Sequence, residues 1–219
     1  MTWETAPLVL WDFNGTLLDD AALCVSCLNE TRRRRSMPEV SLDYYLEHFG
    51  FPVVDFYKKA GFTFERESFA DVAREWNDLY HEKVWTSARL HEGVVPVLEG
   101  LAASGVRQGI LSAYHHGMLT KALAGFGVRV PLDPILGLDD FHADGKEDLG
   151  LRWVESSGLD RSGVILIGDT LHDRDVARAM GIRCALVCRG HQAPARLSGA
   201  GVPVLGDIRE VPGFIKELA

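Results

Sequence analysis

The stretch Leu8–Asp20, LVLWDFNGTLLDD, decides the fold that we expect for this chain of 219 residues. Its first four residues are all apolar, as is typical of a short strand buried on both faces. The apolar run stops at Asp12, and the pair Asn14-Gly15 follows. Asn-Gly favours a β-hairpin. A carboxylate at the end of a buried parallel strand instead marks the sheet edge where α/β proteins bind ligands. The stretch alone leaves both interpretations open, and the rest of the chain favours the second.

The chain after His91 alternates between apolar strand patterns and amphipathic helix patterns, often with glycine at the helix ends. Repeated strand–helix units of this kind predict an α/β fold, a Rossmann-like parallel sheet with helices on both faces. We expect strands over residues 107–111, 133–136, 164–167, 184–187 and 202–205, and helices over 94–103, 118–126, 148–157, 173–180 and 214–218.

Residues 21 to about 90 have a different character, with helical periodicity and no convincing strand. We expect helices over 21–35, 42–48 and 69–85, separated by breaks at Gly50-Phe51-Pro52 and at Gly61. The predicted organisation is therefore an α/β core of residues 1–16 and 91–219, with an α-helical cap of residues 17–90 inserted after the first strand. Aromatic residues cluster in the insert, and those that we expect to face a ligand are Tyr45, Phe49 and Phe51.

The composition is that of an ordinary globular protein, with 47% hydrophobic and 25% charged residues. A net charge of −8 argues against nucleic acid or an anionic membrane as a partner. We find neither a signal peptide nor an apolar run long enough to span a bilayer, so we expect a cytoplasmic protein, monomeric or homodimeric. Cys24 and Cys27 form a CxxC pair that no second pair matches, so we expect neither a disulfide framework nor a zinc site.

Polar residues stand at or just past four predicted strand ends: Asp12, Ser112, Lys146 and Asp169. Because parallel strands end at one edge of the sheet, these side chains are expected to converge. Two carboxylates without a nearby histidine pair suit a hard cation, most simply Mg²⁺. A hydroxyl and an ammonium group suit a phosphoryl group. For Asp169 the alternative is that it only caps the following helix.

The chain resembles the haloacid dehalogenase superfamily of phosphohydrolases, specifically its phosphoglycolate-phosphatase-like branch with a helical (C1-type) cap. Four segments carry the resemblance, in the family's order and at its usual spacing: Asp12-Phe13-Asn14-Gly15-Thr16, Leu111-Ser112-Ala113, Gly145-Lys146-Glu147 and Gly168-Asp169-Thr170-Leu171-His172-Asp173. The resemblance covers essentially the whole chain and implies a phosphatase that acts on a small phosphorylated metabolite.

The resemblance also implies a role for each matching residue. Asp12 would be the nucleophile that forms an aspartyl-phosphate. Lys146 would bind the phosphoryl group and offset the repulsion between nucleophile and target. Asp173 would support the water shell of the metal or orient Lys146. The other substrate-binding residues would be Thr16, Ser112 and Ala113, and the Mg²⁺ ligands Asp12, the Asn14 carbonyl, Asp169 and, through its support, Asp173.

Asn14 departs from the family pattern, because most family phosphatases have an aspartate there that serves as general acid and base. An amide can do neither, and losing such help typically costs roughly 10²–10⁴ in rate. Three explanations stay open: a substrate with a good leaving group, such as an acyl phosphate; a slow or non-catalytic protein that binds a phosphorylated ligand; or an asparagine introduced to trap a substrate. Phosphoryl transfer, and phosphonate hydrolysis through Lys58 or Lys59, are further alternatives.

Overall fold

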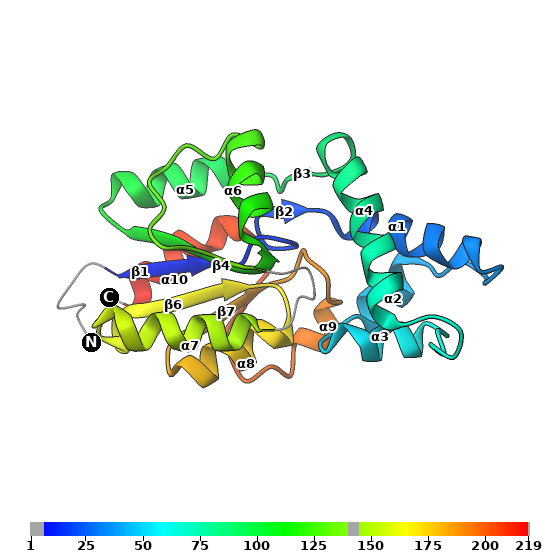
Figure 1. Cartoon of the computed structure of the whole chain (residues 1–219). Helices are drawn as coiled ribbons and strands as arrows, with labels where there is room; N and C mark the ends of the chain where they lie inside the picture. Colours follow the sequence, from blue (N-terminus) through cyan, green and yellow to red (C-terminus); the bar gives the residue numbers. More distant parts are fainter. Residues whose placement is uncertain (1–6, 140–144, 219) are drawn as a thin grey trace.

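The computed structural model describes residues 7–139 and 145–218, which form an α/β sheet with helices around it (Figure 1). The sheet has the strand order β5-β4-β1-β6-β7-β8, and every pair of neighbours is parallel. The predicted Rossmann-like fold class is therefore confirmed, and β1 does not enter a hairpin. The strand bounds are β1 Leu8–Trp11, β4 Arg107–His115, β5 Ile135–Leu138, β6 Val164–Gly168, β7 Arg183–Val187 and β8 Val204–Leu205.

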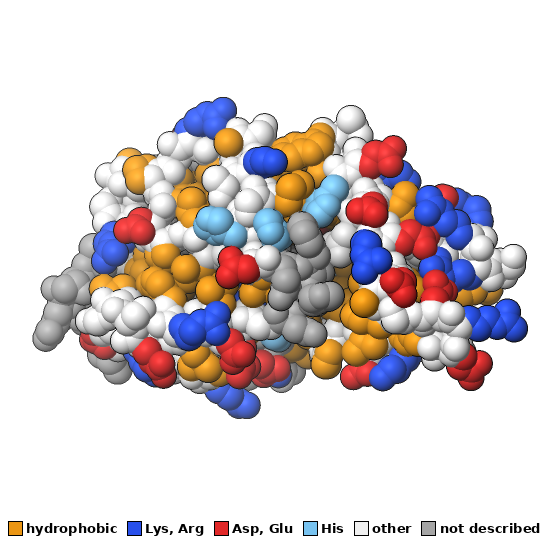
Figure 2. Space-filling view, in the orientation of Figure 1, with side chains coloured by type: hydrophobic (Ala, Val, Ile, Leu, Met, Phe, Trp, Pro, Cys, Tyr) orange, Lys and Arg blue, Asp and Glu red, His pale blue; other side chains and the backbone are white. Residues whose placement is uncertain are grey.

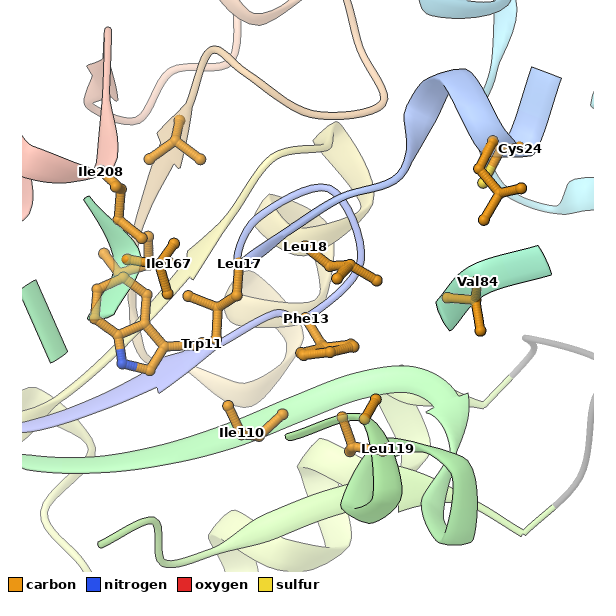
Figure 3. Close-up of a cluster of buried hydrophobic side chains, with 14 of the residues drawn as sticks. Trp11, Phe13, Leu17, Leu18, Cys24, Val84, Ile110, Leu119, Ile167 and Ile208 are labelled. Atoms are coloured by element: carbon orange, nitrogen blue, oxygen red, sulfur yellow. The ribbon is translucent and has the colours of Figure 1, made fainter. Parts of the chain in front are cut away.

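Alternate side chains of β1 enter two separate hydrophobic cores, as expected for a strand covered on both faces. Val9 and Trp11 point into one core, where Trp11 lies near Ile167 and Ile208 (Figure 3). Leu8 and Leu10 point into the other. The four residues are at most 2% exposed, so β1 is the central strand from which the site is built.

Helices cover both faces of the sheet (Figure 1). The Trp11 core contains buried residues of α5 Val94–Ala103, α6 His116–Gly125 and α10 Val211–Leu218. The core on the other face contains residues of α7 Lys146–Ser157, α8 Leu171–Met180 and the short α9 Pro194–Leu197. This arrangement directs the ends of β1, β4 and β6 toward the helices that follow β1 in the sequence.

Those helices lie together at one end of the molecule: α1 Ala21–Arg34, α2 Leu42–His48, α3 Val53–Lys59 and α4 Phe69–Ser87 (Figure 1). Acidic and basic side chains are interspersed over this end (Figure 2). A two-stranded antiparallel ribbon, β2 Leu18–Asp19 with β3 Arg89–Leu90, joins the helices to the sheet. The expectation of no strand up to residue 90 was therefore wrong at Arg89–Leu90, a pair too short to show alternation.

Three local predictions need correction. Helix α3 was not predicted, because its seven residues are too few for a clear periodicity. Strand β4 continues past Leu111 through Ser112 to His115, with a register shift against β5. The helix predicted over 148–157 begins two residues earlier, so Lys146 is the first residue of α7. The described part of the chain contains no helix long and apolar enough to cross a membrane, and all four cysteines are free thiols.

Candidate active site

The parallel strands bring the predicted polar residues to one sheet edge. Asp12 follows the last residue of β1, and Asp169 follows the last residue of β6. Ser112 lies in neighbouring strand β4, which pairs with β1 on the side opposite β6. Since all three strands run in the same direction, their carboxyl ends place these side chains on adjacent positions of one edge.

Lys146 connects two of the carboxylates. Its Nζ donates to Asp12 Oδ1 at 2.6 Å and to Asp173 Oδ1 at 2.5 Å, and the whole lysine is 2% exposed. The other oxygen of Asp173 accepts from the backbone N–H and the hydroxyl of Thr170, which caps α8. Thr170 rather than Asp169 is the N-cap, so the alternative that Asp169 only caps a helix does not hold. Asp173 therefore takes part in two interactions: the capping box of α8 with Thr170, and the buried ion pair with Lys146.

Asp169 is fully buried and held from two sides. Its Oδ1 accepts from the Thr16 hydroxyl at 2.7 Å, and its Oδ2 accepts from the backbone N–H of His191 at 2.7 Å. Position 190, which packs against Asp169, requires glycine because a Cβ there would lie 2.0 Å from Asp169 Oδ2. The observed role of the Thr16 hydroxyl is to hold Asp169 in position. Its predicted contact with substrate stays a prediction.

The electrostatics of this cluster favour a bound cation. Burial raises the pKa of Asp12 to about 7, although Lys146 opposes the rise. Burial likewise raises the pKa of Asp169 to about 6. One oxygen from each of Asp12, Asp169 and Asp173 lies within 4.8 Å of the others. Of the three buried carboxylates, Asp12 and Asp173 share the Lys146 ammonium group and Asp169 does not contact it. This excess of negative charge on hard oxygen ligands matches what a divalent ion such as Mg²⁺ requires.

Asn14 is held in a hydrogen-bond network that the sequence did not predict. Its Nδ2 donates to Asp20 Oδ2 at 2.7 Å and to Tyr80 Oη at 2.8 Å. Asp20 also accepts from the Tyr80 hydroxyl at 2.6 Å and from the Gly15 N–H at 3.0 Å. Because a carboxylate that accepts these bonds cannot donate, the amide nitrogen of Asn14 must face Asp20. The Asn14 side-chain oxygen is therefore directed away from Asp20.

His191 completes the network on its other side. Its Nε2 lies 3.2 Å from Asp20 Oδ1, and its Nδ1 lies 2.9 Å from the Tyr45 hydroxyl. Burial alone would lower the pKa of His191, but the charge and hydrogen bond of Asp20 raise it to about 9. The same partner outweighs burial at Asp20 and lowers the pKa of that carboxyl group. The pair is therefore an imidazolium–carboxylate pair at neutral pH.

Sequence reasoning missed both members of this pair. Asp20 directly precedes the predicted helix over 21–35 and is the N-cap of α1, yet its side chain makes no capping bond. His191 lies four residues after the last residue of β7. The rule that singled out Asp12 and Asp169, polar residues past the ends of parallel strands, would have pointed to the segment after β7, although Arg189 stands nearer the strand end than His191.

A cavity of about 170 Å³ opens above the sheet edge and extends among α1, α2, α3 and α4. Of the predicted core residues, those that line it are Asp12, Asn14, Ser112, Ala113, Lys146 and Asp173. The predicted aromatic residues Tyr45, Phe49 and Phe51 line it from the helical end. Asp169 and Thr16 lie behind this surface. Lys58 and Lys59 are not among the described lining residues, and Lys58 instead pairs with Asp55 on the surface.

The segment between α2 and α3 is fastened to the sheet side of the cavity. Gln192 Nε2 donates to the Phe49 carbonyl at 3.1 Å, and Arg196 Nη1 donates to the same oxygen at 2.6 Å. Phe51 stacks on His172 with a ring-centroid distance of 4.2 Å. The helices that follow β1 are thus closed over the sheet edge by contacts with residues past the ends of β6 and β7.

Residues 9–187 match the family described as haloacid dehalogenase-like hydrolase. A probable phosphatase of Dickeya dadantii is 26% identical over 205 residues, which are 92% of this chain and 89% of that protein. A phosphoglycolate phosphatase of Caulobacter vibrioides is 24% identical, with 93% and 88% of the two chains covered. A haloacid dehalogenase-like hydrolase from Streptococcus pneumoniae shares the fold, with a TM-score of 0.83, 19% identity, and coverage of 96% and 98%.

Proposed function

Because the chain belongs to the haloacid dehalogenase-like hydrolase family, we propose that it is a Mg²⁺-dependent phosphatase that works through an aspartyl-phosphate. The observation that carries the proposal is the Lys146 ammonium group, held within 2.6 Å of the Asp12 carboxylate at the floor of the cavity. We also propose that residues 17–90 are the cap, and that the rest of the chain is the catalytic core.

Asp12 is the nucleophile in this proposal. Its carboxylate oxygen attacks phosphorus while the bond from phosphorus to the leaving oxygen breaks, and water then cleaves the acyl phosphate. Lys146 reduces the repulsion between the anionic oxygen and the anionic phosphoryl group. Ser112 and Ala113 line the cavity beside Asp12, where the hydroxyl of Ser112 and the backbone are available to the phosphoryl oxygens. Asp173 and Thr170 keep Lys146 in position.

The residues present fit a magnesium ion. Asp12 and Asp169 would hold it together with the carbonyl of Asn14, and Asp173 would support its water shell. When bound, the ion supplies positive charge that stabilises the phosphoryl oxygens. Thr16 orients Asp169 through the hydrogen bond to its Oδ1. Thr16 would therefore influence metal affinity without touching the metal.

Asn14 limits the substrates that this site can process quickly. The amide cannot deliver a proton to the leaving oxygen. We therefore propose that the substrate has a weakly basic leaving group, as acyl phosphates do. Two side chains accept from the amide nitrogen of Asn14. A surrounding network that suits an amide supports the proposal that this asparagine is native rather than introduced.

The test is phosphate release from acetyl phosphate with Mg²⁺ and with EDTA, on the unaltered protein and on Asp12→Asn. Turnover that requires both Mg²⁺ and Asp12 is expected. Lys58→Ala is the matched control, because Lys58 is exposed and its ion pair among the described residues is with Asp55. Equal rates in the unaltered protein and Asp12→Asn would contradict the proposal.

A protein that binds a phosphorylated ligand without turnover is the second candidate, and Asn14 is the observation that favours it. Thermal stabilisation by phosphate and Mg²⁺, combined with no release from any ester or acyl phosphate, would select this candidate. A phosphoryl transferase would show turnover only when an acceptor alcohol is added. We do not propose phosphonate hydrolysis, because neither Lys58 nor Lys59 is among the described residues lining the cavity.

A further inference from the structure

We infer that the natural substrate is the phosphate monoester of an uncharged aromatic alcohol, a phenol of about one ring. A phosphate ester whose leaving group carries a free carboxylate, such as 2-phosphoglycolate, is the class that we infer it disfavours. The inference rests on the proposed function and concerns the part of the cavity that receives the leaving group. Asp12 and Lys146 occupy the floor, so the leaving group must extend toward the helical end. Its chemistry is therefore determined by what α1–α4 place there.

One face of each of two helices lines this part of the cavity. On α1 the lining residues are Cys24 and Leu28, four residues apart. On α4 they are Phe69, Ala73, Trp76, Asn77 and Tyr80, at the spacing of a single helical face. Trp76 and Tyr80 stack with a ring-centroid distance of 5.1 Å. Tyr45, Phe49, Phe51 and Phe56 close the cavity from α2, α3 and the segment between them.

Positive charge is missing from this end of the cavity. Among the described lining residues, Lys146 is the one lysine or arginine, and two carboxylates already bind it. His191 is charged but pairs with Asp20. Two arginines at the end of α1 bind carboxylates elsewhere: Arg33 binds Glu30 and Glu39, and Arg34 binds Glu75. Arg35, which follows α1, binds Glu67 and Glu75. Residues 1–6, 140–144 and 219 contain neither lysine nor arginine in the sequence.

Further polar side chains of the described lining are those of Asn77, Tyr114, His115 and His172, and none of them is a lysine or arginine. A carboxylate on the leaving group would therefore be buried among aromatic rings without a lysine or arginine to pair with, and this carries a large desolvation cost. An aromatic ring would meet ring faces and edges instead, with which it packs favourably. An apolar cavity of about 150 Å³ accepts a benzene molecule. This cavity has about 170 Å³ for the phosphoryl group and the leaving group together, which limits the leaving group to about one ring.

Asn14 supports the same inference independently. When the Asp12 oxygen bonds to phosphorus, the electron pair of the breaking bond stays on the leaving oxygen. A phenolate has a conjugate acid of pKa about 10, so it leaves without first receiving a proton and takes its proton from water afterwards. A water molecule then cleaves the aspartyl-phosphate to inorganic phosphate. The absent general acid and the aromatic lining thus favour one class of leaving group.

The experiment compares kcat/KM for phenyl phosphate, 2-phosphoglycolate and acetyl phosphate, all with Mg²⁺. We expect phenyl phosphate to exceed 2-phosphoglycolate by at least about 10-fold, since one misfitted group in a pocket is typically worth about 10-fold to 200-fold. Ala73→Leu fills the ring-binding space and should lower the ratio of phenyl phosphate to acetyl phosphate by about 10-fold or more. Ala70→Leu, on α4 but outside the cavity lining, should leave that ratio unchanged.

The outcomes separate this inference from the proposed function. Turnover of acetyl phosphate combined with a preference for 2-phosphoglycolate would overturn the substrate class and leave the phosphatase standing. Equal ratios in Ala73→Leu and Ala70→Leu would also overturn it. If no substrate is hydrolysed, the proposed function fails. The class of ligand is then tested by how much two non-hydrolysable phosphonates raise the Tm of the protein. A larger Tm increase with phenylphosphonate than with phosphonoacetate would support the aromatic class, and the reverse order would overturn it.

Discussion

Replacing Asn14 with aspartate tests the hydrogen-bond network around position 14. The change puts a carboxyl oxygen where Nδ2 now lies, 2.7 Å from Asp20 Oδ2. Two unit charges at that distance repel by about 6 kcal/mol at an effective dielectric constant of about 20. Protonating a carboxyl group of ordinary pKa costs only about 4 kcal/mol at pH 7. The folded variant should therefore bind an extra proton that lies between the two carboxyl groups.

This extra proton makes the destabilisation of Asn14→Asp depend on pH. A carboxyl group whose pKa is raised on folding binds more protons in the folded state, so the free energy of unfolding falls as pH rises. The slope is about 1.4 kcal/mol per pH unit. Between pH 5.5 and 7.5, we expect the deficit of Asn14→Asp relative to the unaltered protein to grow by up to about 3 kcal/mol.

The assay is urea denaturation in EDTA at both pH values, and the control is the exchange variant Asn14→Asp with Asp20→Asn. The exchange restores an amide–carboxylate pair with one negative charge, so its deficit should not grow with pH. Because the exchange also removes the carboxylate that pairs with His191, a pair whose contribution declines above pH 6.5, its deficit should instead shrink between pH 5.5 and 7.5. With its carboxyl group no longer tied to Asp20, the exchange variant should also hydrolyse alkyl phosphates faster, by up to the roughly 10²-fold expected of a general acid. A deficit of Asn14→Asp that is the same at pH 5.5 and 7.5 would refute the reasoning.

Three further perturbations test other parts of the site. Lys146→Met leaves the buried carboxylates Asp12 and Asp173 without their cation, so unfolding in urea should show a loss of about 3–5 kcal/mol and phosphate release should stop; full stability would contradict the ion-pair geometry. Thr16→Val removes the hydroxyl that holds Asp169 and should raise the Mg²⁺ concentration for half-maximal activity about 10-fold, whereas an unchanged Mg²⁺ titration would show that the bond has no such role. The pKa of His191 is raised from 6.5 to about 9, so its stabilising contribution is complete below pH 6.5 and is lost as pH rises through about 9. That contribution amounts to up to about 3 kcal/mol, and His191→Gln should flatten the stability profile over this interval; parallel profiles would exclude the pair with Asp20 as its origin.

The sequence by itself determined the fold class and the residues of the sheet edge. An apolar run that ends in Asp12, and a second that ends in Gly168-Asp169, follow from local patterns, because a strand buried on both faces has no polar positions until it ends. Helices such as Val94–Ala103 were predicted to the residue, since periodicity and a following glycine are local signals. Convergence of Asp12, Ser112 and Asp169 on one edge needed only the rule that parallel strands end together.

Only the tertiary structure decided what surrounds Asn14 and what lines the cavity. Asp20, Tyr80 and His191 are separated by 60 residues or more in the sequence, and their hydrogen bonds depend on how α4 and the segment after β7 pack against the Asn14 turn. The orientation of the Asn14 amide follows from those partners and from no property of the sequence around it. The aromatic face of α4 could equally have been ordinary core, because helical periodicity shows that a face is buried but not whether another helix or an empty space lies against it.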